Sequence, residues 1–383
     1  MKTEQCVWTG TTGWQKVSGD NLHEEANLVL VFGSREVLSD DARFHEVRSR
    51  YPNARLMLGT TAGEILGTEV LDDSCTVTAI HFEHTPLEFA EVNIDDVGSS
   101  LEAGKRLALA LPHEDLVHVF VLSDGQKVNG SALVEGFYAN LPKTVTTTGG
   151  LAGDAARFTR TLVGLDRAPA EGNIVAVGLY GSHIRVGHGS MGGWDPFGAQ
   201  RLITRAEKNV LYELDGRSAL ELYKMYLGDQ AEGLPGTALL FPLSISMNET
   251  DGELVRTVLS VDEATQSMTF AGDMPVGAYA RLMKANLDRL VDAASTAATE
   301  SYHSFGDFKP ELAILISCVG RKLVLDQRVE EEVENVRDVL GDQATLTGFY
   351  SYGEISPFNP ATRCELHNQT MTITTLAENG HVQ

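Results

Sequence analysis

Cysteine is scarce in this sequence, and none of its four cysteines belongs to a motif. Cys6, Cys75, Cys318 and Cys364 lie far apart along the 383 residues. Because no C-x-x-C pair occurs, the sequence gives no sign of a zinc knuckle, a dithiol redox pair or covalently attached haem. Cys75 and Cys318 fall in apolar, strand-like segments, where a buried structural thiol is the expected role.

Long hydrophobic runs and a surplus of positive charge are also absent. No apolar run approaches the ~18 residues that a membrane-spanning helix requires, and residues 1–5 do not begin a secretion signal. The 30 Lys and Arg residues stand against 53 Asp and Glu residues, which gives a formal net charge of −23. Such a chain is poorly suited to bind nucleic acid phosphates or an anionic membrane. We therefore expect a cytoplasmic protein with neither nucleic acid nor a membrane as partner.

The most informative feature that is present is a unit that occurs three times. Each copy has an apolar strand, a helical stretch and a second strand that enters a glycine-rich loop ending in an acid, and a further strand follows. The first strands are Leu28–Ser34, Val117–Ser123 and Leu312–Ser317, the loops are Gly59–Glu64, Gly149–Asp154 and Gly348–Glu354, and the last strands are Thr76–Phe82, Asn173–Tyr180 and Met371–Leu376. Repeated β-α-β-β units predict an α/β fold in which mixed sheets are flanked by helices.

The length of the chain allows two or three domains, and the repeats favour two. Residues 22–200 hold two units, and residues 201–383 hold hairpins, a long helix and the third unit. The long helix is expected over Tyr279–Tyr302, where apolar residues have helical spacing, and a strand is expected over Ala238–Met247. Three consecutive acids, Glu330–Glu332, are expected on the solvated face of another helix.

Other elements of the first two units can be placed from caps and turns. Asp40–Tyr51 is expected to be a helix that Asp40 caps and Pro52 ends. Ile174–Tyr180 and His183–His188 are expected to form a hairpin, and residues 189–199 a loop.

Glycine at the end of a strand lets the backbone approach a ligand closely and leaves N–H groups free to bind it. The candidate ligand-binding residues are Gly59, Thr60, Thr61, Gly63, Glu64, Gly149, Gly150, Asp154, Gly348, Tyr350, Tyr352 and Glu354. The three acids either orient their loops or face the amines and hydroxyls of a ligand, and the sequence leaves both roles open. We expect the loops to surround one cavity or to pair at pseudo-symmetric positions.

One segment imitates two enzyme motifs. Gly187–Gly193 matches G-x-G-x-x-G and nearly spells G-x-S-x-G around Ser190. Both motifs require a strand that turns directly into a helix, and the following residues Trp194–Gly198 cannot continue one. No nucleophile–base pair emerges elsewhere, so we expect no catalytic residue and no enzyme. A hydrolase that uses His367 remains a remote alternative.

Two histidines occupy inward-facing positions of strands. His188 shares a strand face with Ile184 and Val186, and His367 shares one with Met371 and Ile373. Each is either a core histidine that is satisfied by hydrogen bonds, or a residue that ligates a metal or haem iron or forms a hydrogen bond to a bound ligand.

Three segments resemble signatures of the FIST family of bacterial sensory proteins, over nearly the whole chain. The loop Gly59–Glu64 resembles that of the N-terminal domain, and Asn209–Gly216 resembles the domain junction. Gly348–Ile355 with Leu366–Thr370 resembles the closing motif of the C-terminal domain. The resemblance implies a sensory domain that binds a small ligand in signal transduction.

Stand-alone members of this size include NosP-type proteins, which bind haem, sense nitric oxide and regulate a partner histidine kinase of a two-component system. This resemblance implies haem b as the cofactor, with either His188 or His367, not both, as the iron ligand. It also implies that Arg185 or Arg201 neutralises the propionates. The alternative is a non-haem sensor of a small molecule, for example an amino-acid-like one. The partners would then be a small-molecule ligand or diatomic gas and a histidine kinase or other signalling protein.

Overall fold

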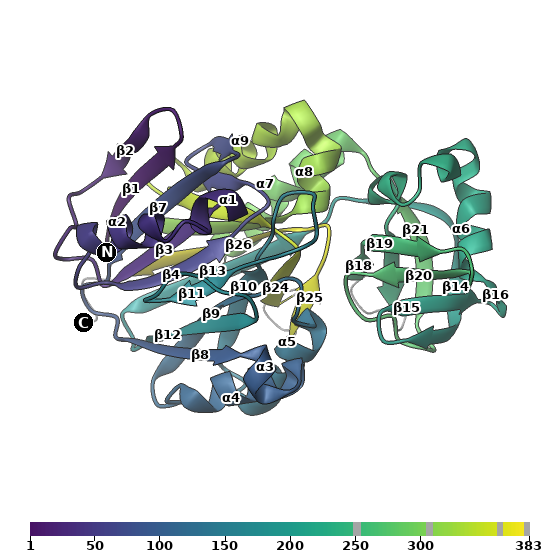
Figure 1. Ribbon diagram of the computed structural model, residues 1–383, viewed down its shortest axis with the longest axis horizontal. Coiled ribbons are helices and arrows are strands. Elements are labelled where there is room, and N and C mark those ends of the chain that lie inside the picture. Colours follow the sequence, from purple (N-terminus) through teal and green to yellow (C-terminus); the bar gives the residue numbers. More distant parts are fainter. Residues whose placement is uncertain (248–253, 304–308, 358–362, 379–383) are drawn as a thin grey trace.

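Three six-stranded mixed sheets form the larger part of the molecule, and a smaller β body is inserted between two of their elements (Figure 1). The computed structural model describes residues 1–247, 254–303, 309–357 and 363–378. Helices flank the sheets, so the expected mixed α/β class is confirmed.

The first sheet is built around the first repeat unit. Its strands, in spatial order, are β11 (Val163–Leu165), β4 (Arg55–Thr60), β3 (Leu28–Gly33), β7 (Ser74–His81), β1 (Lys2–Thr9) and β2 (Gly13–Gly19). Between β3 and β4 the chain forms helices α1 (Arg35–Leu38) and α2 (Asp41–Arg50). Asp40 caps α2 by accepting a hydrogen bond from the Ala42 N–H, as predicted.

The second sheet contains the second unit. Its order is β25 (Cys364–His367), β24 (Gly353–Pro357), β10 (Thr146–Leu151), β9 (Leu116–Ser123), β12 (Asn173–Tyr180) and β8 (Leu87–Asn93). Helices α3 (Ile94–Val97), α4 (Ser100–Ala110) and α5 (Gly130–Asn140) accompany it. Close contact between α4 and α5 requires glycine, because a Cβ on Gly104 would lie 2.2 Å from the Leu133 carbonyl oxygen.

The third sheet contains the third unit. Its order is β13 (Ile184–Met191), β26 (Met371–Glu378), β22 (Leu312–Cys318), β23 (Thr345–Ser351), β5 (Glu64–Leu66) and β6 (Glu69–Leu71). Helices α7 (Leu287–His303), α8 (Val319–Leu325) and α9 (Val329–Leu340) belong to this part of the chain.

The three units exchange strands. After its glycine loop, the first unit contributes β5 to the third sheet, where it pairs with β23. The third unit contributes β24 to the second sheet, where it pairs with β10, and the second unit contributes β11 to the first sheet, where it pairs with β4. Each glycine loop is therefore the place where the chain crosses from one sheet to the next.

The facing sheets share an apolar core. Phe32 of β3 and Phe349 of β23 pack with ring centroids 4.7 Å apart, and Leu122 of β9 and Ile316 of β22 belong to the same buried cluster. This core holds the three units together as the larger body.

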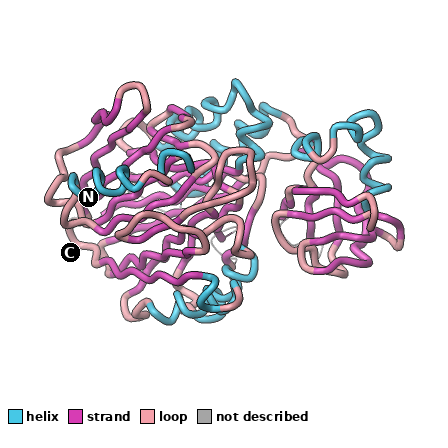
Figure 2. Tube along the Cα trace, viewed as in Figure 1, coloured by secondary structure: helices cyan, strands magenta, loops and turns pink. Residues whose placement is uncertain are grey.

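The smaller body is a β structure with a core of its own, seen at the right of Figure 2. Its strands are β14 (Asp195–Glu207), β15 (Val210–Leu214), β16 (Arg217–Ser218), β17 (Leu243–Ser246), β18 (Leu254–Arg256), β19 (Val258–Asp262), β20 (Ser267–Phe270) and β21 (Tyr279–Lys284), and its helices are α6 (Ala219–Leu227), η1 (Gly228–Gly233) and η2 (Gly236–Leu240). In space this body begins at β14 and ends at β21, and the third unit packs with the first two. The sequence division at residues 200 and 201 stays a prediction about domain boundaries.

Some local predictions are wrong. Ile174–Tyr180 and His183–His188 do not form a hairpin, because β12 is already paired on both edges, with β9 and β8, and β13 pairs with β26 instead. Only residues 192–194 connect β13 to β14. Most of residues 189–199, which were expected to form a loop, therefore belong to these two strands.

Two other segments have a different secondary structure from the expected one over part of their length. The helix expected from Tyr279 begins at Leu287, because Tyr279–Lys284 forms β21 between β14 and β17. In the segment Ala238–Met247, where a strand was expected, only β17 is extended. The first residues of the segment belong to η2.

The acidic run also differs from the expectation at one residue. Glu330 is exposed on α9, but Glu332 is fully buried. It accepts hydrogen bonds from Arg321, Ser317 and Tyr350, which together compensate its removal from water.

Candidate functional site

The three glycine loops meet inside the larger body and bond to one another. The Ala62 N–H donates to the Tyr350 carbonyl oxygen at 2.8 Å, and the Gly153 N–H donates to that of Thr60 at 2.9 Å. The Tyr352 N–H donates to the Leu151 carbonyl oxygen at 3.2 Å, which joins the remaining pair. The expected pairing of the loops is therefore confirmed.

Several loop glycines are needed for close packing. A Cβ on Gly348 would lie 1.8 Å from the Leu315 carbonyl oxygen, and one on Gly149 would lie 2.0 Å from that of Val121. A Cβ on Gly150 would lie 2.8 Å from the Ile316 side chain. Gly59 faces Leu122 at an ordinary contact distance, and Gly63 is covered by Lys322. This packing accounts for the glycines without a ligand, and their role in ligand binding stays a prediction.

Two of the loop acids have matching environments. Glu64 accepts hydrogen bonds from Thr61, three residues earlier, and from Ser74. Glu354 accepts from Ser351, again three residues earlier, at 2.6 Å and from Thr370 at 3.0 Å. Burial raises the pKa of Glu64 to about 7 and that of Glu354 to about 8.

The third acid is held by a different set of groups. Asp154 accepts from Arg35 Nη1 at 2.8 Å, from Thr159 and from the hydroxyl of Tyr352. Burial alone would raise its pKa, but the hydrogen bonds from Tyr352 and from the backbone of Arg160 hold the pKa below its usual value. Asp154 is therefore an ionised group that fixes the second loop against the third.

The other predicted loop residues are also engaged within the fold. The Thr60 hydroxyl accepts from the Leu162 N–H, and the Tyr350 hydroxyl donates to Glu332. Tyr352 stacks on Phe158 with ring centroids 4.5 Å apart.

Beside Glu354 lie two buried amide side chains for which the described residues provide no partner. Asn368 and Gln369 form the turn between β25 and β26 and are both fully buried. The amide nitrogen and oxygen of each side chain make no hydrogen bond among the described residues. Gln369 has a left-handed backbone with φ of 63°, which places its amide over Gly320. Buried polar groups are nearly always paired, so these two amides mark the site that most requires an explanation.

The turn is held in place through its backbone. The Cys318 N–H donates to the Thr370 carbonyl oxygen at 3.1 Å, and Trp194 Nε1 donates to that of Gln369 at 2.8 Å. Glu354 accepts from both the N–H and the hydroxyl of Thr370. The backbone of the turn is thus fixed while its two amide side chains remain unsatisfied.

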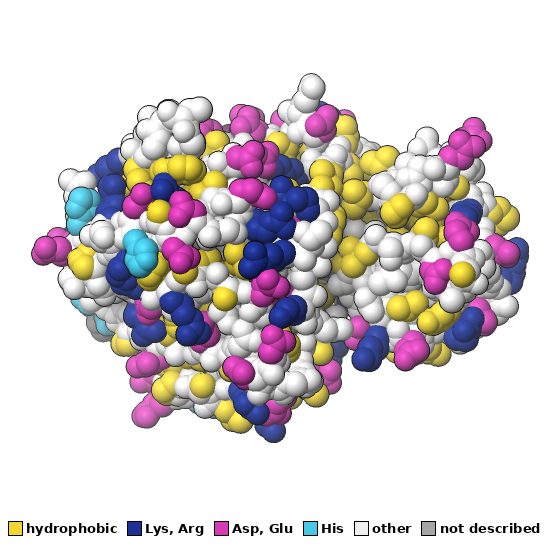
Figure 3. Space-filling view, in the orientation of Figure 1, with side chains coloured by type: hydrophobic (Ala, Val, Ile, Leu, Met, Phe, Trp, Pro, Cys, Tyr) yellow, Lys and Arg dark blue, Asp and Glu magenta, His cyan; other side chains and the backbone are white. Residues whose placement is uncertain are grey.

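The two bodies meet next to this turn. Arg256 of β18, in the smaller body, donates to the Leu366 carbonyl oxygen at 3.0 Å, and burial lowers the pKa of Arg256 to about 10. A second polar contact joins Asn129 to Asp273 at 3.1 Å. On the face shown in Figure 3, hydrophobic side chains gather along the groove at this junction. The exposed Leu240 of η2 and Leu323 of α8 belong to elements that contact each other there.

The residues expected to hold a haem lie on three strands, β13, β14 and β25. His188 is buried on β13 and its Nδ1 has no hydrogen-bond partner among the described residues. His367 is buried on β25, where its Nε2 lies 2.9 Å from the Ser356 carbonyl oxygen. Arg185 is on β13 of the larger body, whereas Arg201 is on β14 of the smaller one and binds Asp215 and Tyr226. Within the described ranges, no three His, Cys, Asp or Glu side chains form a group that could hold a metal ion.

Sequence reasoning did not select Asn368, Gln369 or Arg256. The signal for the first two was available, because Asn-Gln stands between two apolar strands within the closing motif. Arg256 gave no signal, since only the packing of the smaller body brings it to the turn.

Comparison with known proteins gives a family assignment. Residues 27–217 match the model of the FIST N domain, and residues 219–357 match that of the FIST C domain. No curated protein matches the chain. Among solved structures, a cyanuric acid hydrolase from A. caulinodans is similar with 8% identity and a TM-score of 0.36, over 93% of this chain and 90% of that one. No helix in the described part of the chain is long and apolar enough to cross a membrane.

Proposed function

Since the chain belongs to the FIST family, whose domains are generally small-ligand sensory domains of signal transduction, we propose that it is a cytoplasmic sensor that binds its ligand at the Asn368–Gln369 turn. One observation carries this proposal. Two fully buried amides that have no hydrogen-bond partner in the described part of the chain lie beside the Glu354 carboxyl, at the junction between the two bodies.

The chemistry of the turn favours a ligand with both donors and acceptors. Each amide presents an N–H₂ donor and a carbonyl acceptor. Glu354, with a pKa of about 8, is mostly protonated at neutral pH and adds an O–H donor that accepts as well. A small molecule with an amine or amide and a carboxyl or carbonyl group, such as an amino acid, matches this set. Leaving such groups unpaired costs about 1–3 kcal/mol each, which a suitable ligand would recover.

The position of the turn gives binding a route to a signal. Arg256 contacts the carbonyl of Leu366, two residues before Asn368. A ligand that occupies the turn would favour one orientation of the smaller body relative to the larger one. Such a preference is sufficient to shift a conformational equilibrium. A histidine kinase or another signalling protein would read that change.

The experiment is a calorimetric titration of the full-length protein with the standard amino acids and with urea as a minimal amide. We expect saturable binding of at least one amino acid that Asn368→Leu and Gln369→Leu weaken at least tenfold. Gln126→Leu, at an exposed position, serves as the matched control and leaves binding unchanged. Absence of binding by every compound, or binding that both turn variants retain, would refute the proposed site.

The haem form of the sensor has one supporting observation, the buried Nδ1 of His188, which bonds to none of the residues that the structure describes. The donor set fits a haem only in part, because Arg201 is occupied by Asp215 and Tyr226. Haem bound here would supply an iron centre for a diatomic gas such as nitric oxide, with His188 or His367 holding the iron. An absorption spectrum of protein produced with added haem tests this form. A Soret band that His188→Ala or His367→Ala shifts would support it, and no band, or one that neither variant alters, would leave the non-haem sensor.

A further inference from the structure

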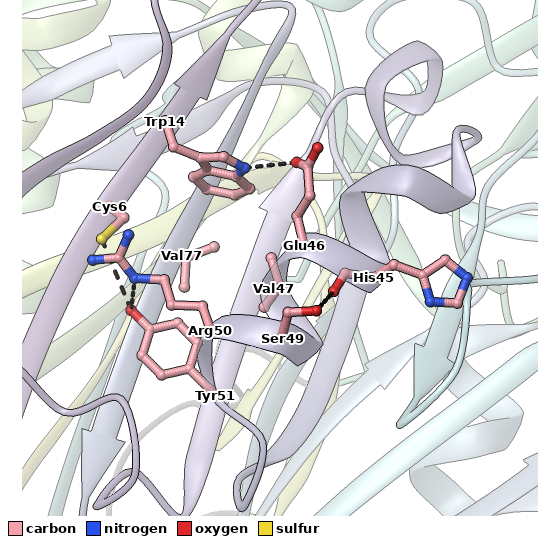
Figure 4. Close-up of a pocket in the computed structure, with 9 residues that line it drawn as sticks. All are labelled: Cys6, Trp14, His45, Glu46, Val47, Ser49, Arg50, Tyr51 and Val77. Carbon is pink, nitrogen blue, oxygen red and sulfur yellow. Dashed lines mark hydrogen bonds between the residues drawn. The ribbon is translucent and has the colours of Figure 1, made fainter.

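A cavity lies apart from the closing turn, between the N-terminal hairpin and helix α2 (Figure 4). Its volume is about 490 Å³, within the roughly 300–1,000 Å³ typical of small-molecule sites. Strands β1, β2 and β7 supply Cys6, Trp14 and Val77, and α2 and the residue after it supply the rest of the wall. Because the FIST N match begins at residue 27, the β1–β2 hairpin that closes the cavity lies outside the matched part of the chain.

The inner wall of the cavity is apolar. Cys6, Val47, Val77 and the ring of Tyr51 line it and are almost completely buried. The Trp14 indole forms an outer wall, and its position is fixed because its Nε1 donates to Glu46 Oε2 at 2.7 Å (Figure 4). A flat hydrophobic group fits between such surfaces, and a rigid aromatic wall favours an aromatic one.

The Arg50 guanidinium is the cationic group that lines this cavity. Arg50 Nη2 donates to the buried Glu4 carboxylate at 2.6 Å, and Nε donates to the Tyr51 hydroxyl at 3.2 Å. No hydrogen bond is found for its third nitrogen, Nη1, among the described residues, so this nitrogen can still donate to an acceptor.

The charges around the cavity favour a neutral acceptor over an anionic one. Glu4 compensates Arg50, and Glu46 adds a carboxylate near Trp14 that Arg43 pairs at 3.0 Å. Arg50 therefore offers a directed N–H donor with little net positive charge. An uncharged carbonyl meets this donor without placing a third anion beside Glu4 and Glu46.

We infer that this cavity is a second binding site, separate from the proposed sensory turn, and that it takes a small uncharged aromatic compound with a carbonyl oxygen. The ring would lie between Trp14 and Val77, and the oxygen would accept a hydrogen bond from Arg50 Nη1. Cys6 and Val47 would complete the apolar surface around the ring.

Benzamide is the probe, with benzoate and toluene as comparison compounds, and binding to the full-length protein is followed by Trp fluorescence and ligand-observed NMR. We expect benzamide to bind more tightly than benzoate. Its affinity should exceed that of toluene, which lacks the oxygen, by about tenfold or more. Benzoate binding as tightly as benzamide, or toluene binding equally, would overturn the stated ligand class.

Two variants and one control locate the binding. Val77→Phe fills the cavity from β7, and Ser49→Trp blocks its mouth from an exposed position on α2, so the second variant tests the site even if the first disturbs folding. Both should weaken benzamide binding at least tenfold. His45→Ala is the matched control, because His45 belongs to the rim but its ring points away from the other lining residues (Figure 4). Binding that Ser49→Trp leaves unchanged, or no binding of benzamide at about 10 mM, would refute the site.

Discussion

Arg321 and Glu332 form an ion pair with no exposed side-chain surface, with Nη2 and Oε2 2.8 Å apart. Four further groups bond to this pair. Arg321 also donates to the carbonyl oxygens of Gly192 and Leu290, and Glu332 also accepts from Ser317 and Tyr350. The pair thus links α8 and α9 to the start of α7 and to the connection that leads into the smaller body.

Glu332→Gln should destabilise the larger body by about 3–5 kcal/mol, because it leaves the Arg321 charge buried and uncompensated. Urea unfolding followed by circular dichroism measures the loss. Glu331→Gln, one residue earlier on the exposed side of α9, should change stability little. Equal stability of both variants would show that the buried pair contributes nothing.

Stability should fall as pH rises toward 8, because Glu64 and Glu354 have folded-state pKa values of about 7 and about 8. Unfolded glutamate titrates near 4.3, so between that pH and the folded pKa only the unfolded state has lost its proton. Each carboxyl then lowers the free energy of unfolding by up to about 1.4 kcal/mol per pH unit. Urea unfolding at pH 5, 6, 7 and 8 should show a smaller decline in Glu354→Gln, and an unchanged decline would contradict this reading.

Asn368→Leu should leave the ligand-free protein as stable as before or more stable, because it removes a buried amide that has no partner. The same substitution at Asn173 is the matched control. Asn173 is also buried, but its amide is bonded to Asn93 and Val163, so Asn173→Leu should cost about 1–3 kcal/mol. Thermal unfolding without added ligand separates the two, and equal losses would mean that the Asn368 amide is satisfied.

Gly348→Ala should destabilise the protein by about 3 kcal/mol or more, since the new Cβ would meet the Leu315 backbone, which cannot move aside in a paired strand. Gly236→Ala on η2, where nothing lies within 4 Å of the new Cβ, should stay within about 0.5 kcal/mol of wild type. Chemical denaturation of both variants makes the comparison. A tolerated Gly348→Ala would show that the Leu315 backbone can move aside.

The three repeat units could be predicted from the sequence because each has its own apolar strands and a glycine-rich loop that ends in an acidic residue. The assignment of strands to sheets could not, because β5, β11 and β24 leave their units at the glycine loops. Nothing local distinguishes β24 pairing with β10 from β24 pairing within its own unit. The hairpin expected at His183–His188 is wrong for the same reason, since the partner of β13 is the last strand of the chain.

The sequence was sufficient to predict the glycine-rich loops next to the candidate site. Glu354 lies where its motif placed it, and its pairing with Ser351 is local. Asn368 and Gln369 were overlooked because an amide in a turn is usually solvated, and only their complete burial makes them unusual. Glu332 was misplaced because its partner Arg321 lies 11 residues earlier on another helix, and nothing in the sequence indicates that this side chain also turns inward.

The exchange of strands has a consequence for synthesis of the chain on the ribosome. β10 leaves the ribosome long before β24, and β5 long before β23, so one edge of each strand stays unpaired until β23 and β24 emerge. Unpaired strand edges are templates for pairing with other chains, and sheets closed by such distant contacts form slowly. Newly made molecules therefore pass through a period in which they depend on protection from aggregation, and a chain that stops before residue 353 leaves two of the three sheets open.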